Sequence, residues 1–533
     1  MPKSLYLINP RAKVPGYYGA DVFEQAGLSP AVGIADLAIV TVAALAPPDW
    51  EVTICDEHIS AVDFDSAADF IGITGKITQS ERILELASEF RARGKCVVIG
   101  GPHASLSPEV FRGRSDVLVI GELESIAPEL FSDLEHGRWK SEYTAPKPDL
   151  SWSPIPRWDL YPTGRSLVGC VQTSRGCPFE CEFCDVIQYL GRKQRHKPLP
   201  QVLAELDVLY QKGFRGVFLA DDNFTVYRRR AKEILTGLRD WNRTRPGRAM
   251  SFTTQVSVDA ARDPELLQLC GEAGITSVFV GIETPNQDSL RETKKRQNVG
   301  IDLIQQIELF LQYGISVTAG MMIGFDHDGP GIFEQQFDFA MESPVPIFTL
   351  SALVAPAATP LFARMKREAR LTSGGDVAGS PWDTNIVPAR MTRQELLEGL
   401  RWLCRELYRP ENFTKRVLRM IDCLRSVKGP FSADLGSIGE PRAVESEALL
   451  VIQKIRSLGA EERRMIPTIL HAMQEKPHSR RQVTDALYRY AQARCVYQAG
   501  GVWQPQPTTV STDFVQLEPR TQVAHLGSEA PNR

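Results

Sequence analysis

Three cysteines share one short segment of the chain and carry its strongest chemical signal. Cys177, Cys181 and Cys184 lie within the run Cys-Pro-Phe-Glu-Cys-Glu-Phe-Cys. Thiolates are soft ligands that suit iron–sulfur clusters and zinc. A structural zinc site takes four protein ligands, whereas three ligands leave a coordination position open, as a catalytic metal requires. The segment therefore predicts a metal centre with one open position.

The cysteine segment has two other interpretations. His196 or Cys170 could supply a fourth ligand and complete a plain structural zinc knuckle. The three thiols could also be unliganded, although a polar turn is a poor place for buried, inert cysteines. We favour an open iron–sulfur cluster over both.

Composition excludes several classes of protein. The 533 residues carry 61 Lys and Arg against 65 Asp and Glu, a net charge of −4. A slightly acidic chain does not suit a general nucleic-acid binder, because phosphates require a basic surface, and we read the basic run 191–197 as a solvated loop. Ten cysteines are too few for a disulfide scaffold. With neither a secretory signal nor an apolar stretch of membrane-spanning length, we expect no transmembrane segment and a cytoplasmic protein.

The alternation of apolar strands and amphipathic helices predicts an α/β fold class with several domains. Short apolar strands separated by helices indicate parallel sheets covered on both faces, with ligands bound at the carboxyl ends of the strands. The expected organisation is a doubly wound domain (1–140), a proline-rich linker (141–166), a partial or full parallel (β/α) barrel (167–360), a helical domain (361–500) and a disordered tail (501–533). Expected strands are 5–8, 51–55, 70–74, 96–99 and 117–120, then 168–173, 215–220, 251–256, 277–282, 315–323 and 347–354, and a helix is expected over 33–46.

The cysteine segment and the strand ends that follow it resemble the radical S-adenosylmethionine (radical SAM) family. The run from Thr173 to Cys184 has that family's CxxxCx(aromatic)C pattern, and residues 218–224, 280–284 and 320–324 resemble its later strand ends. The resemblance implies a 4Fe-4S cluster held by the three cysteines, whose open iron chelates S-adenosylmethionine and yields a 5′-deoxyadenosyl radical. It also implies that Phe183, Asp222, Glu283 and Gly320 lie near this cofactor.

The first domain resembles the cobalamin-binding subclass of that family. The similar segments are 55–57, 100–104 and 121–124, and the connector 155–160. Gly100 and Gly101 leave room for a flat macrocycle against the backbone, and His103 is the expected neighbour of the corrin. His58 belongs to a stretch similar to another cobalamin motif, but that stretch follows the second strand instead of the first, so we do not expect it to ligate cobalt.

Segments 353–361, 384–388, 396–399 and 407–413 resemble the C-terminal domain of the hopanoid C-2 methylases and their relatives. The leading hypothesis is a cobalamin-dependent radical SAM enzyme that methylates an unactivated carbon of a small molecule or lipid, with an electron donor of the flavodoxin or ferredoxin type. The alternatives are radical cyclisation or rearrangement with the same cofactors, and a non-catalytic iron–sulfur or cobalamin sensor. No side chain is assigned a catalytic role beyond these cofactor contacts.

Overall fold

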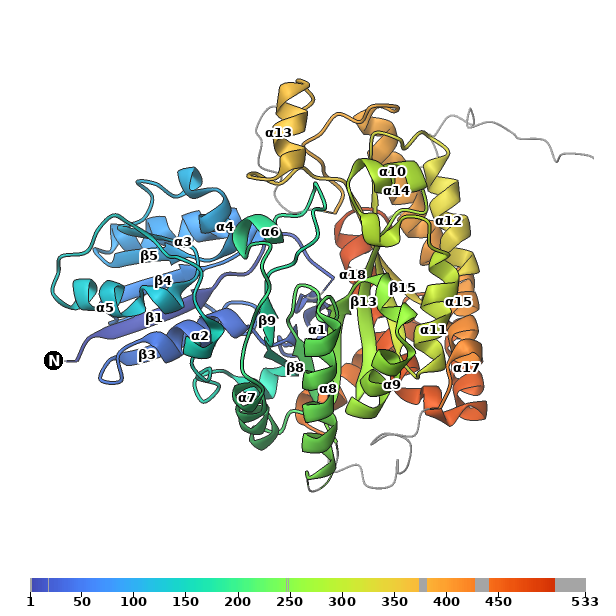
Figure 1. The fold of residues 1–533 in the computed structure, drawn as a ribbon, viewed down its shortest axis with the longest axis horizontal. Coiled ribbons are helices and arrows are strands. Elements are labelled where there is room, and N and C mark those ends of the chain that lie inside the picture. Colours follow the sequence, from blue (N-terminus) through green and yellow to red (C-terminus); the bar gives the residue numbers. More distant parts are fainter. Residues whose placement is uncertain are drawn as a thin grey trace, which may run out of the picture.

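The fold is known from a computed structural model that describes residues 2–17, 19–245, 247, 249–372, 381–426 and 441–503. Two separate parallel sheets make up its centre. Figure 1 shows the N-terminal sheet in blue beside the barrel strands in green, with the C-terminal helices in orange and red along the barrel. The expected tail begins at 501, and from 504 onward it lies outside the described residues.

The N-terminal sheet has six parallel strands in the order β3-β1-β4-β5-β6-β7, a doubly wound arrangement. All five strands expected from the sequence are present, and β7 is an addition. The strands are β1 (Ser4–Asn9), β3 (Glu51–Asp56), β4 (Phe70–Thr74), β5 (Cys96–Gly100), β6 (Val117–Ile120) and β7 (Glu142–Thr144). Its helices are α2 (Leu37–Leu45), α3 (Ser80–Ala92), α4 (Pro102–Leu106) and α5 (Ala127–Glu135).

The second sheet has seven parallel strands in the order β15-β14-β13-β12-β11-β8-β2. Its edges β15 and β2 are not paired with each other, so the barrel is partial. The six expected strands are β8 (Ser166–Val171), β11 (Gly216–Leu219), β12 (Ser251–Val256), β13 (Ile275–Glu283), β14 (Ser316–Ile323) and β15 (Ile347–Ala352). The helices between and beside them are α6 (Val186–Tyr189), α7 (Leu199–Gln211), α8 (Arg228–Arg243), α9 (Pro264–Ala273), α10 (Gln287–Glu292), α11 (Leu303–Gln312) and α12 (Ile332–Glu342). A short antiparallel pair is formed by β9 (Ser174–Arg175) and β10 (Arg195–His196). The chain between these two strands carries Cys177, Cys181 and Cys184 and is called the cysteine loop below.

The expected helix over 33–46 was wrong at its start. Strand β2 (Val32–Ile34) occupies that position and pairs with β8, with Val32 opposite Ser166. The helix α2 begins at Leu37 because the Asp36 side chain accepts a hydrogen bond from the Ile39 N–H, which caps the helix. The N-terminal region therefore donates an edge strand to the barrel sheet.

The C-terminal region is helical, as expected. It contains α13 (Pro360–Arg367), α14 (Arg393–Leu407), α15 (Pro410–Cys423), α16 (Ala443–Lys454), α17 (Ala460–Glu475) and α18 (Arg480–Ala499). Helix α18 also packs against α1 (Asp21–Gln25) and β15. Helix α13 stands apart from the rest, above the cysteine side of the barrel (Figure 1). Within the described segments, no helix combines the length and the apolar character needed to cross a bilayer.

Candidate cofactor site

Two aspartates that follow strand β11 hold the segment that leads into the cysteine loop. Asp221 is buried and accepts hydrogen bonds from the backbone N–H of Thr173 at 2.6 Å and of Ser174 at 3.1 Å. Asp222 accepts one from the N–H of Gly176 at 2.7 Å. Burial raises the pKa of Asp222 to about 6, against the lowering effect of that N–H bond. Because Gly176 directly precedes the first cysteine, these carboxylates fix the direction in which the loop leaves the barrel.

The three cysteines follow this segment on one loop, with Cys181 buried and the others partly buried. Burial raises the pKa of the Cys184 thiol to about 12 and also raises that of Cys177. Among the described residues, no three His, Cys, Asp or Glu side chains are gathered closely enough to hold a metal ion. The loop thus brings the three thiols near one another, but not close enough to share a single metal ion. Metal binding would also have to displace the protons of the thiols.

A buried ion pair lies beside the cysteine loop. Glu283, at the end of β13, has a φ of +65° and accepts a hydrogen bond from Lys295 Nζ at 2.6 Å. A Cβ on Gly281 would lie 2.3 Å from the Glu283 carboxylate and 2.9 Å from Lys295 Nζ, so a side chain there would require the ion pair to shift. Burial alone would lower the pKa of Lys295, but Glu283 and the nearby Cys181 thiol raise it above its usual value. The sequence did not single out Lys295. This residue lies far from the cysteine segment along the chain, and local sequence patterns do not indicate such a contact.

Phe183 and Gly320 complete the predicted positions in the barrel. The Phe183 ring lines the central cavity, and Lys295 Nζ lies 6.0 Å from its centroid. Gly320 lies on β14, where an added Cβ would meet the Phe279 ring at 2.8 Å. The glycine therefore lets an aromatic side chain of β13 project into the barrel.

The cysteine loop is bonded to the N-terminal domain through two buried glutamates and two partly buried arginines. Glu122, which follows β6, pairs with Arg175 at 2.7 Å and with Arg195 at 2.6 Å. Arg175 also pairs with Glu124 at 2.7 Å. Burial would raise the pKa of Glu124, but Arg175 outweighs it and holds the pKa below its usual value. These pairs fix the cysteine loop relative to the sheet of the N-terminal domain.

At the end of β5, the carboxyl edge of the N-terminal sheet exposes backbone that carries no side chains. Gly100 and Gly101 line the cavity, and Gly101 has a φ of +96°, a conformation that disfavours any side chain. His103 lies elsewhere: its ring is buried, 3.0 Å from the Ser80 hydroxyl and edge-on to Phe111. The structure therefore brings the two predicted glycines to the cavity but not the His103 ring.

His58 is the histidine that does line the cavity. Its Nδ1 lies 3.0 Å from Asp56 Oδ1, and the buried Asp56 also accepts the Tyr161 hydroxyl at 2.6 Å and the Asn9 amide at 3.2 Å. This carboxylate fixes the orientation of the imidazole.

One cavity of about 1150 Å³ connects the two sheets. The barrel strands line it with neutral side chains: no residue of β8 or β11–β15, all fully described, adds a charge. Charged side chains reach it there from neighbouring segments, namely Asp36, Arg175 and Arg489. The polar side chains that these strands contribute are Thr253, Thr254, Gln255, Ser277, Thr318, Thr349 and Ser351. On the other side the cavity extends along the N-terminal sheet. Its apolar lining there comes from β1 and β6 (Leu7 and Val119) and from α2 and α5 (Leu45, Leu130 and Phe131). Such a space suits ligands larger than one small metabolite.

Comparison with known proteins identifies the family. The model of the Radical SAM superfamily matches residues 171–340, and that of a domain of unknown function (DUF4070) matches residues 359–483. The chain is 36% identical over 427 residues to an uncharacterized methyltransferase, sll1242, of Synechocystis sp., covering 78% of this chain and 77% of that protein. This chain belongs to the radical SAM superfamily. The resemblance drawn from the cysteine segment is thereby confirmed.

Other relatives of this radical SAM protein carry methyltransferase names. The hopanoid C-2 methylase of Rhodopseudomonas palustris is 33% identical over 341 residues, which cover 62% of this chain and 64% of that enzyme. The bacteriochlorophyllide d C-12(1)-methyltransferase of Chlorobaculum tepidum is 26% identical over 405 residues, 72% of this chain and 84% of that enzyme. The match thus spans slightly less than two thirds of the hopanoid enzyme.

Solved structures share the whole architecture at low sequence identity. OxsB, a cobalamin-dependent S-adenosylmethionine radical enzyme solved with aqua-cobalamin and S-adenosylmethionine, has a TM-score of 0.61 at 16% identity, covering 94% of this chain and 85% of that one. TsrM from Kitasatospora setae, a radical S-adenosylmethionine methyltransferase solved with cobalamin and a [4Fe-4S] cluster, has a TM-score of 0.56 at 15% identity, covering 89% and 100%. The expected fold class is confirmed.

Proposed function

We propose that this radical SAM protein is a cobalamin-dependent methyltransferase that acts on an unactivated carbon of a neutral small molecule or lipid. The observation that carries the proposal is the single cavity of about 1150 Å³ that joins the carboxyl edges of both parallel sheets beside the cysteine loop. One cofactor site in each sheet would face the same substrate there. The methyltransferase names of the relatives support the reaction type.

The barrel residues fit the cluster and S-adenosylmethionine. Cys177, Cys181 and Cys184 would hold the cluster, and three thiolates leave the open position that the sulfonium cofactor needs. When bound, the cluster and S-adenosylmethionine supply hydrogen abstraction. Glu283 and Lys295 place fixed charges of both signs beside this loop, matched to a cofactor that carries an ammonium and a carboxylate group.

The N-terminal edge fits a corrinoid. Gly100 and Gly101 offer backbone without side chains to a flat macrocycle, and the apolar extension of the cavity beside α2 and α5 gives room for its side groups. When bound there, cobalamin supplies the methyl group. The ion pairs of Arg175 with Glu122 and Glu124 hold the two cofactor regions together at their junction.

The barrel wall supports the proposed substrate class. Thr253, Gln255, Ser277 and Thr318 line the cavity with groups that hydrogen-bond, and Phe279 adds an aromatic face. An ionised substrate would meet no opposite charge from these strands and would lose its hydration. A neutral molecule with apolar surface and a few hydroxyl, carbonyl or amide groups suits this wall.

An acidic electron-transfer protein of the flavodoxin or ferredoxin type is the proposed reductant. Arg192 and Lys193 are exposed on the cysteine loop, and Lys294 and Arg296 are exposed beside Lys295. Such basic residues would steer an acidic partner to the cluster. The ten free cysteines of the structure suit a reducing compartment, and the proposal accordingly places the protein in the cytoplasm.

The test is anaerobic reconstitution with iron, sulfide and cobalamin, followed by reduction and addition of S-adenosylmethionine with a deuterated methyl group. A hopanoid hydrocarbon is the first substrate probe, and a bacterial lipid extract is the second. We expect 5′-deoxyadenosine and a product that gains one labelled methylene unit. Release of 5′-deoxyadenosine without any mass gain in the product would favour cyclisation or rearrangement, and no nucleoside release at all would refute the radical mechanism.

A further inference from the structure

Helix α13, the first helix of the DUF4070 match, is bonded directly to the cysteine loop. The backbone N–H of Leu361 donates to the carbonyl of Glu182 at 3.1 Å, and Glu182 lies between two of the three cysteines. The Thr359 hydroxyl caps the helix by accepting the Phe362 N–H at 3.1 Å, which sets its starting direction. The unassigned C-terminal region therefore begins on the backbone of the cofactor loop.

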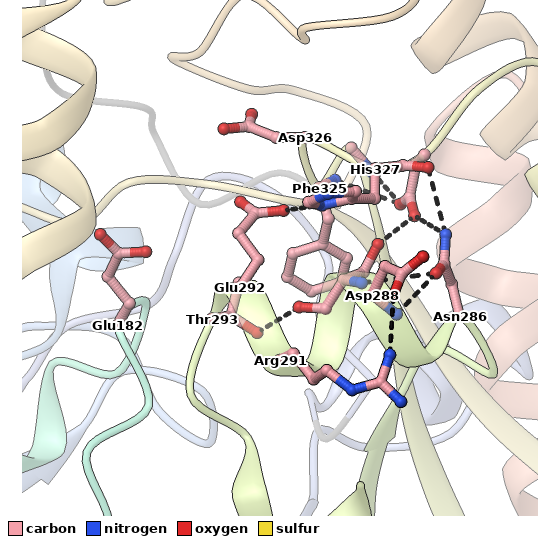
Figure 2. A network of polar contacts seen from close by, with 12 residues as sticks. Glu182, Asn286, Asp288, Arg291, Glu292, Thr293, Phe325, Asp326 and His327 are labelled. Atoms are coloured by element: carbon pink, nitrogen blue, oxygen red, sulfur yellow. Dashed lines mark hydrogen bonds and ion pairs between the residues drawn. The ribbon is translucent and has the colours of Figure 1, made fainter.

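Arg364 of α13 binds three carboxylates from three separate segments. Its guanidinium pairs with Glu182 of the cysteine loop at 2.9 Å, with Glu292 at the end of α10 at 2.8 Å, and with Asp326 after β14. Figure 2 shows these three carboxylates around one space, with the Glu292 carboxylate also bonded to His327. The side chain of Arg364 is only 17% exposed and that of Glu182 only 10%, so these are well-shielded pairs.

Apolar contacts reinforce this attachment. Leu361 and Met365 of α13 are buried in one cluster with Phe325, and Phe183 of the cysteine loop packs against that cluster. The rings of Phe183 and Phe325 lie 6.1 Å apart at an interplanar angle of 56°. The amide of Glu182 donates to the Thr293 carbonyl at 2.9 Å, so a second segment, the one that follows α10, also holds the loop.

We propose that α13 is a brace for the cluster loop and that Arg364 is a positioning residue acting through Glu182. The inference rests on the cluster assignment of the proposed function. Residues that fix metal ligands from outside the coordination shell govern how well the site retains its metal. Arg364 suits this role because its planar guanidinium presents five N–H donors in a fixed fork, whereas a lysine carries a compact charge on a flexible stem. In this role, the C-terminal region helps to position the loop that binds the cluster.

The test compares R364Q and R364K with a matched control, R370Q. Arg370 bonds the same Asp326 at 2.5 Å, and also Glu368 and the Val387 carbonyl, but it does not contact Glu182. Iron release from the reconstituted protein to a chelator is measured, together with the change that S-adenosylmethionine causes in the electron paramagnetic resonance spectrum of the reduced cluster. We expect R364Q to release iron about 10-fold to 100-fold faster and to show an altered spectrum. R370Q should match the wild-type protein in both, and R364K should recover part of the loss.

E182Q provides a second test of the same ion pair if R364Q folds poorly. It should change both measurements in the same direction, and the E182Q/R364Q double variant should release iron no faster than R364Q alone, because both changes break one contact. Iron retention and a spectrum like those of the wild type in R364Q, or rate increases that multiply in the double variant, would overturn the brace. A wild-type protein that takes up no cluster would instead refute the proposed function.

Discussion

The carboxyl ends of the strands differ between the two sheets. On the N-terminal sheet, Gly100, Gly101 and Gly121 leave the backbone open, and the last two have φ values of +96° and +98°. On the barrel, the edge carries charged side chains, with Glu283 bonded to Lys295. The ends of parallel strands thus carry glycines without side chains at one place and a paired set of charges at the other.

The difference follows from the size and charge of the proposed ligands. A broad, flat macrocycle gains from contact with backbone and apolar surface, for which glycine is the only residue without steric cost. A small charged cofactor and a metal cluster gain from fixed charges and charge-assisted hydrogen bonds in a shielded site. Variants of each edge should therefore affect only the cofactor on that edge.

The largest expected effect is on the barrel edge. C181A should abolish formation of the 4Fe-4S cluster, because two thiolates cannot replace three ligands, while cobalamin binding is retained. Iron and sulfide analysis and the absorption spectra of the two cofactors measure this separation. Loss of both cofactors from a folded C181A protein would contradict the independence of the two edges.

On the N-terminal edge, G101A should weaken cobalamin binding about tenfold and leave the cluster intact. The new Cβ would lie 2.3 Å from the Thr74 hydroxyl and 3.1 Å from the Gly75 nitrogen, at an unfavourable φ of +96°, and strain of about 1–3 kcal/mol is typical of such a conformation. G94A is the matched control, because Gly94 has a φ of +73° with nothing within 4 Å. Titration of cobalamin by absorption compares the two, and equal affinities would show that crowding at Gly101 has no role.

The charges of the barrel edge should tune the cluster with opposite signs. K295M removes a buried cation near Cys181 and Cys184 and should lower the reduction potential of the cluster. E283Q removes the neighbouring negative charge and should raise the potential. Shifts on the order of tens of millivolts are expected from Coulomb's law at protein dielectric values. A redox titration that gives shifts of the same sign in both variants would exclude an electrostatic origin.

The smallest expected effect concerns a barrel carboxylate outside the cavity. Asp328 is buried and accepts the N–H groups of Gly324 at 3.0 Å and Phe325 at 3.1 Å, and the Ser289 hydroxyl at 2.8 Å. Burial raises its pKa from 3.8 to about 6. The folded protein therefore binds this proton more tightly than the unfolded chain does, and its stability falls as the pH rises from 3.8 to about 6, then stays level.

D328N has no proton to lose at this position. Its stability relative to the wild-type protein should therefore rise with pH across that window by up to about 1.4 kcal/mol per pH unit. Thermal denaturation of both proteins at several pH values measures the difference. Melting curves that stay parallel from about pH 4 to about pH 7 would show that Asp328 does not titrate in this range.

Much of the fold and part of the site could be predicted from local sequence. The pattern of apolar residues predicted every strand of the N-terminal sheet except β7 and all barrel strands except β2. This was possible because the apolar residues of a buried strand can be recognised in its own sequence. The cysteine segment indicated both the metal chemistry and the family, and Gly100 and Gly101 were expected at the cavity. The roles of the individual site residues stay predictions.

The contacts missed from the sequence are those between distant segments. Strand β2 joins the barrel only because β8 accepts it as an edge partner, and the sequence around Gly33 carries no sign of that partner. His58 lines the cavity, whereas the ring of His103, the histidine expected there, contacts Ser80 instead. Lys295 gave no local signal at all.

The sequence by itself determined which chemistry is present, since residue types and their spacing along one loop define a ligand set. Only the tertiary structure decided what holds that loop in place. Arg364 meets Glu182 across 182 positions of sequence, and Arg175 meets Glu122 across 53. The periodicity of apolar residues predicts which face of a segment is buried. It does not indicate which charged residue, distant in sequence, will pair with a buried carboxylate.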